Sequence, residues 1–421
     1  METLTNPAVL SLVALLAVIL LSLTSRINVG ILAVALAWPV AMFAAGWKAD
    51  TLMAVFPAPL FLTLLGVTML FGIGEKNGTL TALTDRAVRA CGRGTAGLPW
   101  LFFILAGLAS SLGPGAIAAT ALVAPLAMSA GFTAGVPPFL MALMVANGAN
   151  AGNLSPFSAV GVIVQAQMHK AGLPHHDWGV FLANFVAHTL AALAAYALFG
   201  GLKLLKARHA EAHIQPAAPT PLTKRHWLTV AILGVWIVGV VFLKMNPGLT
   251  AIAAACLLIL LRAGEDKAAL ESVPWAVLVM VCGVSVLIGV LEKTGGMNLF
   301  TTMLSHITTP DTANGMMAFV TGLISTYSST SGVVYPAFLP TVPGLVEKLG
   351  GGNPLEIALS INVGAAIVDV SPLSTIGALC IAALPAKQDA KALFRQMLAW
   401  GFAMILAGAI FCQLFIRFFA W

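Results

Sequence analysis

Apolar and polar stretches alternate along the whole chain, and the apolar stretches are long. They lie at about residues 7–24, 28–46, 53–73, 97–130, 136–168, 178–202, 227–243, 247–261, 274–291, 315–345, 354–385 and 396–418. An α-helix needs about 20 apolar residues to cross the hydrocarbon core of a bilayer, and most of these stretches come close to that length or exceed it. The pattern predicts an all-α polytopic membrane protein.

Two of the longest stretches are interrupted near their centres. The run 97–130 contains SSLGPG, Ser110 to Gly115, and the run 315–345 contains STYSSTSG, Ser325 to Gly332. Gly-Pro-Gly stops a helix, and clusters of Ser, Thr and Gly are typical of turns. Each run is therefore predicted to form a re-entrant hairpin whose tip lies inside the membrane.

Two other long stretches are too long for one straight crossing. The run 136–168 would form a helix of about 50 Å, whereas the hydrocarbon core is about 30 Å thick. Its middle carries NGANAGNLSP, Asn147 to Pro156, and the run 354–385 carries VGAAIVDVSP, Val363 to Pro372, at the matching place. Both runs are predicted to be helices broken near the middle of the membrane.

The two halves of the chain resemble each other. GVTMLFGIGEKNG, Gly66 to Gly78, matches GVSVLIGVLEKTG, Gly283 to Gly295, 217 positions later. SPFSAVG, Ser155 to Gly161, matches SPLSTIG, Ser371 to Gly377, 216 positions later. A coincidence between low-complexity apolar segments is the alternative, but two matches in the same order at nearly one offset favour a duplicated unit.

A basic, Pro- and Ala-rich connector, residues 203–226, separates the first repeat (1–202) from the second (227–421). Each repeat is predicted to have five transmembrane helices and one hairpin. Because five is odd, the second repeat is inserted upside down. With the connector in the cytoplasm, fifteen of the 21 Lys and Arg residues fall inside. Both termini are then periplasmic, and the segments 79–95 and 297–309 lie along the interface.

Composition excludes several classes of function. Only 9% of the residues are charged and 59% are hydrophobic, with a mean hydropathy of +0.97, which is far from a soluble domain. The net charge of +6 is dispersed over loops, so no nucleic-acid partner is expected. The five cysteines are far apart and indicate neither disulfides nor a metal site. The sequence contains neither an ATP-binding GxxxxGK[ST] motif nor a catalytic Ser-His-Asp set, so we expect no enzyme.

The four interruptions are expected to meet at one site. Broken helices persist in a membrane only where they line a cavity or are covered by protein. Their free helix N-termini favour an anion, and Gly allows close approach to the backbone. The alternative is that Ser, Asn and Gly only aid helix packing. The predicted substrate-binding residues are Ser110, Ser111, Gly113, Gly115, Asn147, Asn150, Asn153, Ser155, Ser328, Ser329, Thr330, Ser331, Ser371, Ser374 and Thr375.

Asp369 is the only acidic residue deep in an apolar run, and the offset of 216 pairs it with Asn153. A carboxylate beside an anion site repels the substrate unless it holds a cation or a proton, so Asp369 is predicted to bind the coupling ion. A purely structural acid is the alternative. Oxygen atoms of neighbouring residues can complete a sodium site, and no other cofactor is expected. The predicted coupling-ion residues are Asp369, Ser111, Asn150, Asn153, Thr326 and Thr330.

The hairpins, the broken helices with Ser-Pro, the basic connector and the inverted repeat together resemble the ion transporter superfamily. SSLGPGAIAATALVAPLA and NGANAGNLSPFSAVGVIV in its first half are similar to dicarboxylate carriers of the MatC (malonate carrier) type. The resemblance implies a homodimer that works by an elevator motion, with a transport domain from 97–168 and 315–385 and a scaffold from the remaining spans. The related sodium–dicarboxylate symporters have Ser-Asn-Thr at each hairpin tip, which this chain lacks, so sodium and the proton both remain candidates.

These observations together predict a secondary transporter of the bacterial inner membrane. It would import a small dicarboxylate, malonate or a C4 acid, driven by sodium or protons. The interruptions contain no Lys or Arg, so helix dipoles, amides and hydroxyls would recognise the anion. Two alternatives remain: the membrane subunit of a binding-protein-dependent (TRAP-like) transporter, and a cation/proton antiporter. His188, alone in an apolar run, is interpreted as a packing residue, with a role in proton transfer as the alternative.

Overall fold

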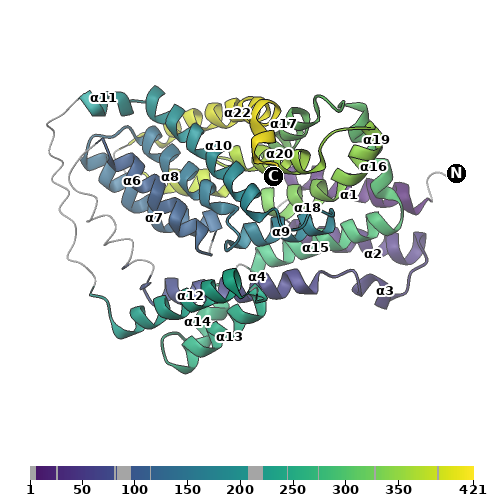
Figure 1. The fold of residues 1–421 in the computed structure, drawn as a ribbon, viewed down its shortest axis with the longest axis horizontal. Coiled ribbons are helices and arrows are strands. Elements are labelled where there is room, and N and C mark those ends of the chain that lie inside the picture. The colour runs from purple at the N-terminus through teal and green to yellow at the C-terminus, as the bar shows by residue number, and fades with distance from the viewer. Residues whose placement is uncertain are drawn as a thin grey trace.

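The structure is a computed structural model, and it describes residues 6–24, 27–79, 82, 96–113, 115–206, 221–243, 245–273, 275–326, 329–385 and 388–421. Within these ranges the secondary structure is entirely helical, as the hydrophobic pattern predicts (Figure 1). In Figure 1, α4, α12, α13 and α14 lie along the lower edge, α6, α7, α8 and α10 lie on the left above them, and α1, α2, α15 and α16 lie on the right.

The first half of the chain contains ten α-helices in the described ranges. They are α1 (Pro7–Thr24), α2 (Val29–Pro39), α3 (Ala49–Met53), α4 (Ala58–Lys76), α6 (Leu98–Ser111), α7 (Gly115–Thr133), α8 (Pro138–Asn153), α9 (Ala159–Lys170), α10 (Asp177–Leu198) and α11 (Gly201–Lys206). A short π-helix, η2 (Val40–Ala44), continues α2.

The second half begins with α12 (Lys224–Phe242), α13 (Pro247–Leu260), α14 (Asp266–Glu271), α15 (Trp275–Lys293), α16 (Gly296–His306) and α17 (Ala313–Ser325). It continues with η3 (Thr330–Val334), α18 (Tyr335–Phe338), η4 (Leu339–Thr341), α19 (Val342–Leu349), α20 (Pro354–Ile367), α21 (Thr375–Ala382), α22 (Ala390–Phe415) and η5 (Ile416–Phe419). The 3₁₀ piece η4 contains Pro340, and Pro336 and Pro343 lie in the short helices on either side of it, so this stretch lacks several backbone donors of a regular helix.

Both predicted hairpins have their interruption in the expected motif. α6 ends at Ser111 and α7 begins at Gly115, and the two helices pack against each other. Gly113 adopts φ +136°, and a Cβ atom there would lie 2.0 Å from the Phe71 ring, so this turn requires glycine. In the second hairpin, α17 ends at Ser325 and the chain becomes helical again at Thr330.

Both predicted broken helices are also broken, but both breaks begin later than expected. α8 runs without interruption through Asn147 and Asn150 to Asn153, and the break covers only residues 154–158. The helix persists because Gly148 and Gly152 lie directly against the backbone of α6, where added Cβ atoms would lie 2.2 Å from carbonyl oxygens. The Gly-xxx-Gly spacing is a helix-packing signal that outweighs the low helix propensity of these residues. In the second half, α20 likewise stays helical through Val363 to Ile367, and the break covers residues 368–374 instead of the predicted 363–372.

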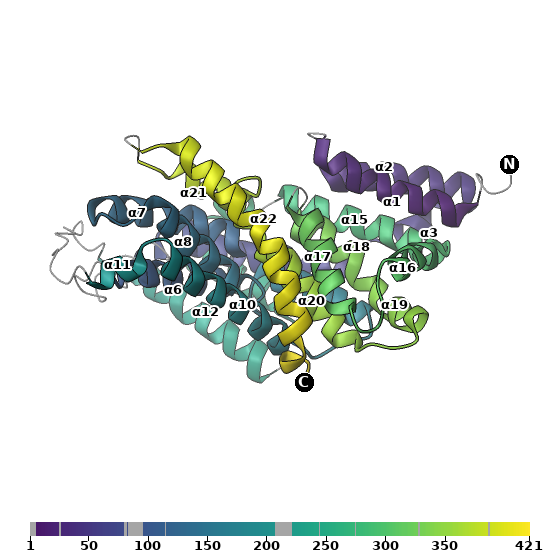
Figure 2. The same ribbon diagram turned by 90° about the horizontal axis from the view of Figure 1, so that it is seen from above.

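Helix positions and helix contacts recur between the two halves. α4 and α15 each have 19 residues and begin 217 positions apart. α4 packs against α13, whereas α15 packs against α2. In the same way α6 packs against α8, and α17 packs against α20. In Figure 2 the long α22 crosses the middle of the molecule between the region of α7 and α8 and the region of α1 and α2.

Four of the described helices are long and apolar enough to cross a membrane: α4, α7, α10, and α22 with its extension η5. The pair α15 and α16, which is bent by 92°, makes a fifth if it is counted as one span. Six shorter apolar helices of 10–17 residues accompany them, and three of these are hairpin arms or halves of broken helices: Leu98–Ser111, Ala313–Ser325 and Pro354–Ile367. The sharp bend is consistent with α16 lying along the interface, whereas most of the matching segment 79–95 lies outside the described residues.

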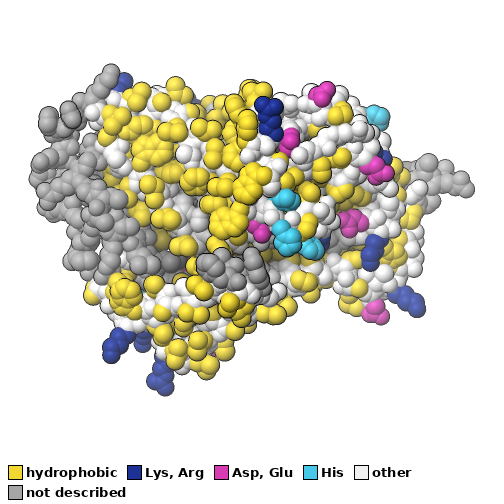
Figure 3. Space-filling model, viewed as in Figure 1, with side chains coloured by type: hydrophobic (Ala, Val, Ile, Leu, Met, Phe, Trp, Pro, Cys, Tyr) yellow, Lys and Arg dark blue, Asp and Glu magenta, His cyan; other side chains and the backbone are white. Residues whose placement is uncertain are grey.

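The surface fits a membrane environment. On the face shown in Figure 3, hydrophobic side chains cover much of the described surface from left of centre to the centre, and charged side chains lie mainly toward the right and lower edges. Large apolar residues such as Leu190 and Leu198 of α10 are exposed. Side chains of this kind are stable on the outside of a protein when lipid surrounds them.

Candidate functional site

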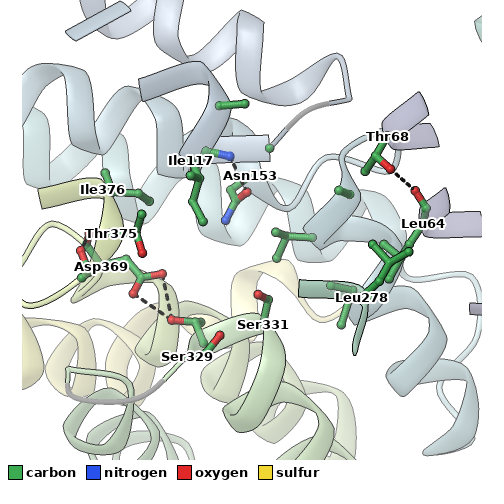
Figure 4. Close-up of a pocket in the computed structure, with 18 of the residues that line it drawn as sticks. Leu64, Thr68, Ile117, Asn153, Leu278, Ser329, Ser331, Asp369, Thr375 and Ile376 are labelled. Atoms are coloured by element: carbon green, nitrogen blue, oxygen red, sulfur yellow. Dashed lines mark hydrogen bonds between the residues drawn. The ribbon is translucent and has the colours of Figure 1, made fainter. Parts of the chain in front are cut away.

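The four interruptions meet at a cavity of about 440 Å³ (Figure 4). Its wall includes residues from both hairpin tips, both helix breaks and α4. The described residues that line it are Leu64, Thr68, Gly72, Glu75, Gly115, Ala116, Ile117, Ala118, Asn153, Ala159, Val160, Ile163, Ser272, Leu278, Ser329, Thr330, Ser331, Asp369, Leu373, Ser374, Thr375 and Ile376. Pockets for small molecules commonly have volumes of roughly 300–1,000 Å³.

At the first break, Asn153 is the last residue of α8. Its Oδ1 accepts the backbone N–H of Ala116 in the first turn of α7, with an N···O distance of 2.9 Å. The Ser158 hydroxyl donates to the carbonyl of Asn153, and its oxygen accepts the N–H of Gly161 at 2.9 Å, which caps α9. The hairpin tip and both halves of the broken helix are thus connected by side-chain hydrogen bonds.

The second break repeats this arrangement with different chemistry. The Ser374 hydroxyl donates to the carbonyl of Asp369 at 2.5 Å and accepts the N–H of Gly377 at 3.2 Å, which caps α21. Where Asn153 meets a backbone N–H of its hairpin, the Asp369 carboxyl meets the Thr330 hydroxyl of the second hairpin. Both carboxyl oxygens lie 2.8 Å from Thr330 Oγ1 (Figure 4).

The cavity wall is polarised by helix ends. α7, α9 and α21 all begin at the cavity, with Gly115, Ala159 and Thr375 among its lining residues. A helix N-terminus carries a partial positive charge and free N–H groups, which favour an anion. Among the described lining residues none is Lys or Arg, and the two acids are Glu75 and Asp369.

α4 forms a wall that sequence reasoning did not assign to the site. Leu64, Thr68, Gly72 and Glu75 of this helix line the cavity, and Leu278 of α15 lies beside them (Figure 4). Their spacing of four, four and three residues places them on one face of the helix. That spacing is visible in the sequence, but the other faces of α4 are also apolar, so the sequence does not show which face meets the cavity.

The structure brings eight of the predicted substrate-binding and coupling-ion residues to the cavity. They are Gly115, Asn153, Ser329, Thr330, Ser331, Asp369, Ser374 and Thr375. Another eight are not among the residues that line it: Ser110, Ser111, Gly113, Asn147, Asn150, Ser155, Ser371 and Thr326. Ser328 lies outside the described residues.

Several of the residues away from the cavity have local partners instead. Ser155 and Ser371 accept backbone N–H groups within their own breaks, each at 3.3 Å. Thr326 donates to the carbonyl of Gly322 at 2.9 Å. These hydroxyls therefore shape the breaks.

A separate polar group lies between α8 and α10. His188 Nδ1 and Asn147 Oδ1 are 3.0 Å apart, and Asn184 Nδ2 donates to the carbonyl of Asn150 at 2.7 Å. All four residues are fully buried. Because the contacts are one helical turn apart, they fix α10 along the side of α8 that carries Asn147.

Comparison with known proteins agrees with this architecture. Residues 5–153 match the family model described as "Dicarboxylate carrier protein MatC N-terminus". No curated protein matches the chain significantly. The chain is similar in structure to the Alcanivorax borkumensis YdaH transporter, with a TM-score of 0.64 and 16% identity over 98% of each chain.

A second similar structure is MtrF of Neisseria gonorrhoeae, which is described as illuminating a class of antimetabolite efflux pumps. It has a TM-score of 0.57 and 14% identity, over 97% of this chain and 95% of MtrF. At these identities the likeness establishes a shared fold. The protein therefore has the fold of known polytopic membrane transporters, and its first third matches a dicarboxylate carrier family.

Proposed function

We propose that the protein is a secondary active transporter that imports a small dicarboxylate, malonate or a C4 acid, across the bacterial inner membrane, coupled to sodium or protons. The observation that carries the proposal is the cavity of about 440 Å³ at which both hairpin tips and both helix breaks meet. The match of residues 5–153 to a dicarboxylate carrier family supports the substrate class.

The chemistry of the cavity suits a small, partly hydrated anion. Three helix N-termini and the side chains of Asn153, Ser331 and Thr375 offer hydrogen-bond donors, and no described lining residue is Lys or Arg. Donors of this kind bind a carboxylate without the strong attraction of a fixed cation, so release stays easy. Malonate is smaller than the cavity, which leaves room for water.

We further propose that the chain is built from two inverted repeats and moves as an elevator. The recurrence of α4 and α15 at one offset, and of the matching helix contacts, supports the repeat. The transport domain would comprise residues 97–168 and 315–385, and the remaining spans would form the scaffold, in a homodimer with periplasmic termini. In this arrangement the α4 wall belongs to the scaffold, so the cavity lies where the two domains meet.

Transport by the purified chain in liposomes tests the proposal. We expect uptake of radiolabelled malonate or succinate that depends on an imposed sodium or proton gradient, and stabilisation of the detergent-solubilised protein by the same acid. Ser331→Ala should reduce uptake, whereas Thr302→Ala, which removes a hydroxyl bonded to its own helix in α16, should not. No uptake and no stabilisation by any dicarboxylate would refute the proposal.

Asp369 in the cavity favours one second candidate, a cation/proton antiporter. It predicts stabilisation by sodium alone and exchange of sodium for protons without an organic acid. A binding-protein-dependent transporter is distinguished by the same liposomes, because it would need an added periplasmic partner for uptake.

A further inference from the structure

A chain of hydrogen bonds connects the carboxyl group of Asp369 in the cavity wall to the backbone of α20. Thr330 Oγ1 lies 2.8 Å from both carboxyl oxygens of Asp369 and 2.5 Å from Ser325 Oγ. Ser325 Oγ in turn lies 2.8 Å from the carbonyl oxygen of Ala365 in the last turn of α20. Three contacts thus link one carboxyl group, two hydroxyl groups and one backbone carbonyl.

The hydrogen of Ser325 is committed to Ala365. Carbonyl groups in the last turn of a helix lack the usual partner four residues later. Here the N–H of Asp369, the residue that would serve Ala365, donates to Ala366 at 3.1 Å. Ser325 is 2% exposed and Ala365 is fully buried, so a carbonyl without a donor would be costly.

The remaining two contacts then need two more hydrogens. A distance of 2.5 Å between the Ser325 and Thr330 oxygens requires a hydrogen between them. Because the Ser325 hydrogen already points to Ala365, this hydrogen belongs to Thr330. Thr330 has no second hydrogen to offer to Asp369. The contact between Thr330 and Asp369 is satisfied only if the carboxyl group donates, which means that it carries a proton.

We propose that the carboxyl group of Asp369 binds the coupling proton, and that Thr330 and Ser325 position it through a one-directional hydrogen-bond chain that ends at the carbonyl of Ala365. The inference rests on the proposed transport function and names its coupling ion. The proton arrives from water in the cavity, binds one carboxyl oxygen, and leaves to water on the opposite side of the membrane.

A proton at this position also removes an electrostatic conflict. The cavity offers helix N-termini to an anion, yet Asp369 would oppose the anion if it were ionised. With the proton bound, the group is neutral and resembles Asn153, its counterpart in the other half, which already occupies the cavity wall as a neutral amide. Loading of the proton and binding of the anion therefore favour each other, as symport requires.

Other titratable groups do not replace this role. Glu75 of α4 also lines the cavity and is exposed, and no described hydroxyl group is hydrogen-bonded to its carboxyl group. The Tyr335 hydroxyl of α18 donates to the carbonyl of Asn362 at 3.1 Å, and the Cys380 thiol of α21 is directed toward the carbonyl of Ala142. Among the described residues that line the cavity, Asp369 is the acid whose carboxyl group contacts a hairpin hydroxyl.

Infrared difference spectroscopy tests the proton directly, without a substrate. Purified protein in sodium-free lipid nanodiscs should show the C=O stretch of a protonated carboxylic acid, and Asp369→Asn should lack it. No difference between wild type and Asp369→Asn across the physiological pH range would overturn the proposal. Loss of the band when sodium is added at constant pH would also overturn it, because the site would then belong to sodium.

Ser325→Ala tests the hydrogen-bond chain. Without Ser325 the Thr330 hydrogen is free to donate to an ionised carboxylate, so the band should disappear at a pH about one unit lower than in wild type, the equivalent of one hydrogen bond. Thr321→Ala is the matched control, because it removes a buried hydroxyl of the same helix that donates to Met317. Equal titration of Ser325→Ala and wild type would contradict the chain.

Coupling is measured in liposomes that contain a pH-sensitive dye. Malonate added outside should carry protons inward in the wild type and not in Asp369→Asn. If malonate is taken up with sodium and without protons, the proton assignment fails and the proposed function stands. If malonate neither binds nor enters, the proposed function fails, and the infrared titration still decides the proton site.

Discussion

The Asn153 side chain accepts the backbone N–H of Ala116 at 2.9 Å, so the end of α8 is joined to the beginning of α7 at the edge of the cavity. This single contact links a helix break to a hairpin tip 37 residues away in sequence. It combines the role of a helix cap with a place in the candidate binding wall, and the two roles can be separated by mutation.

Replacing Asn153 by Ala should affect both stability and transport. The Ala116 N–H loses its acceptor, which should lower the free energy of unfolding by about 1–2 kcal/mol. Loss of an amide from the cavity should reduce dicarboxylate uptake about tenfold, the equivalent of one hydrogen bond to the substrate. Thermal unfolding and initial uptake rates measure the two effects.

Asn246→Ala provides the control for that experiment. Asn246 caps α13 by accepting the N–H groups of Gly248 and Leu249, each at 3.0 Å, and it is not among the residues that line the cavity. Its loss should lower stability by a similar amount and leave uptake of the folded protein unchanged. Equal uptake by both variants would make Asn153 a purely structural residue.

Neutralising Glu75 should strengthen anion binding. Its carboxylate lines the cavity and is exposed to water, so Glu75→Gln removes a repulsive charge that salt partly screens. We expect the KM for the dicarboxylate to fall by a factor of about three to ten, with the larger change at low ionic strength. Glu271→Gln, an exposed acid at the end of α14, should leave KM unchanged. A higher KM in Glu75→Gln would instead indicate a direct contact with a bound cation.

A methyl group at Gly152 should force α6 and α8 apart. A Cβ atom there would lie 2.2 Å from the carbonyl oxygen of Gly107 and 2.7 Å from Ser111 Oγ. Backbone atoms cannot move aside as a flexible side chain can. We therefore expect Gly152→Ala to lower the free energy of unfolding by more than about 3 kcal/mol or to prevent folding. Gly234→Ala, in α12 with nothing within 4 Å of the added atom, should be neutral or slightly stabilising. Similar melting temperatures for the two variants would contradict the close packing.

His188 is expected to hold helices together rather than to move protons. Its Nδ1 contacts Asn147 Oδ1 at 3.0 Å, on the face of α8 that meets α10. His188→Gln keeps a polar partner for Asn147, so proton-coupled uptake should persist at half the wild-type rate or more. His188→Leu should lower the free energy of unfolding by about 1–3 kcal/mol, because the buried amide oxygen loses its partner. Loss of proton coupling in His188→Gln, with uptake retained, would assign it a role in proton transfer.

The sequence is most informative where a short motif, or the length of one apolar run, determines the local structure by itself. Gly-Pro-Gly at residues 113–115 and the excess length of the runs 136–168 and 354–385 were sufficient to predict that the chain is interrupted there, and the structure has all of these breaks. The offset of 216 positions between the two halves also pairs Asn153 with Asp369, and both residues line the same cavity. These signals depend on single residues or short spacings, which sequence displays directly.

The sequence is least informative where contacts between neighbouring helices determine the local structure or the role of a side chain. The excess length of the run 136–168 predicts a break that includes Asn147 and Asn150, yet packing of Gly148 against Phe103 keeps α8 intact there. The role of Ser325 depends on a carbonyl 40 residues away, which no local pattern contains. The cavity wall formed by α4 depends on which face of that helix meets the hairpins, and an almost wholly apolar helix does not reveal that face.

The two capping serines have a consequence for binding affinity. Ser158 donates to the last residue of α8, Ser374 donates to Asp369 within the second break, and each serine accepts from the helix that follows, so each corner is already fixed before any ligand arrives. An anion that enters such a preorganised corner does not have to order a loop, and it loses little of its binding free energy to conformational entropy. If the cavity binds an anion as proposed, its described lining, which includes no Lys or Arg, can therefore still retain the anion long enough for transport.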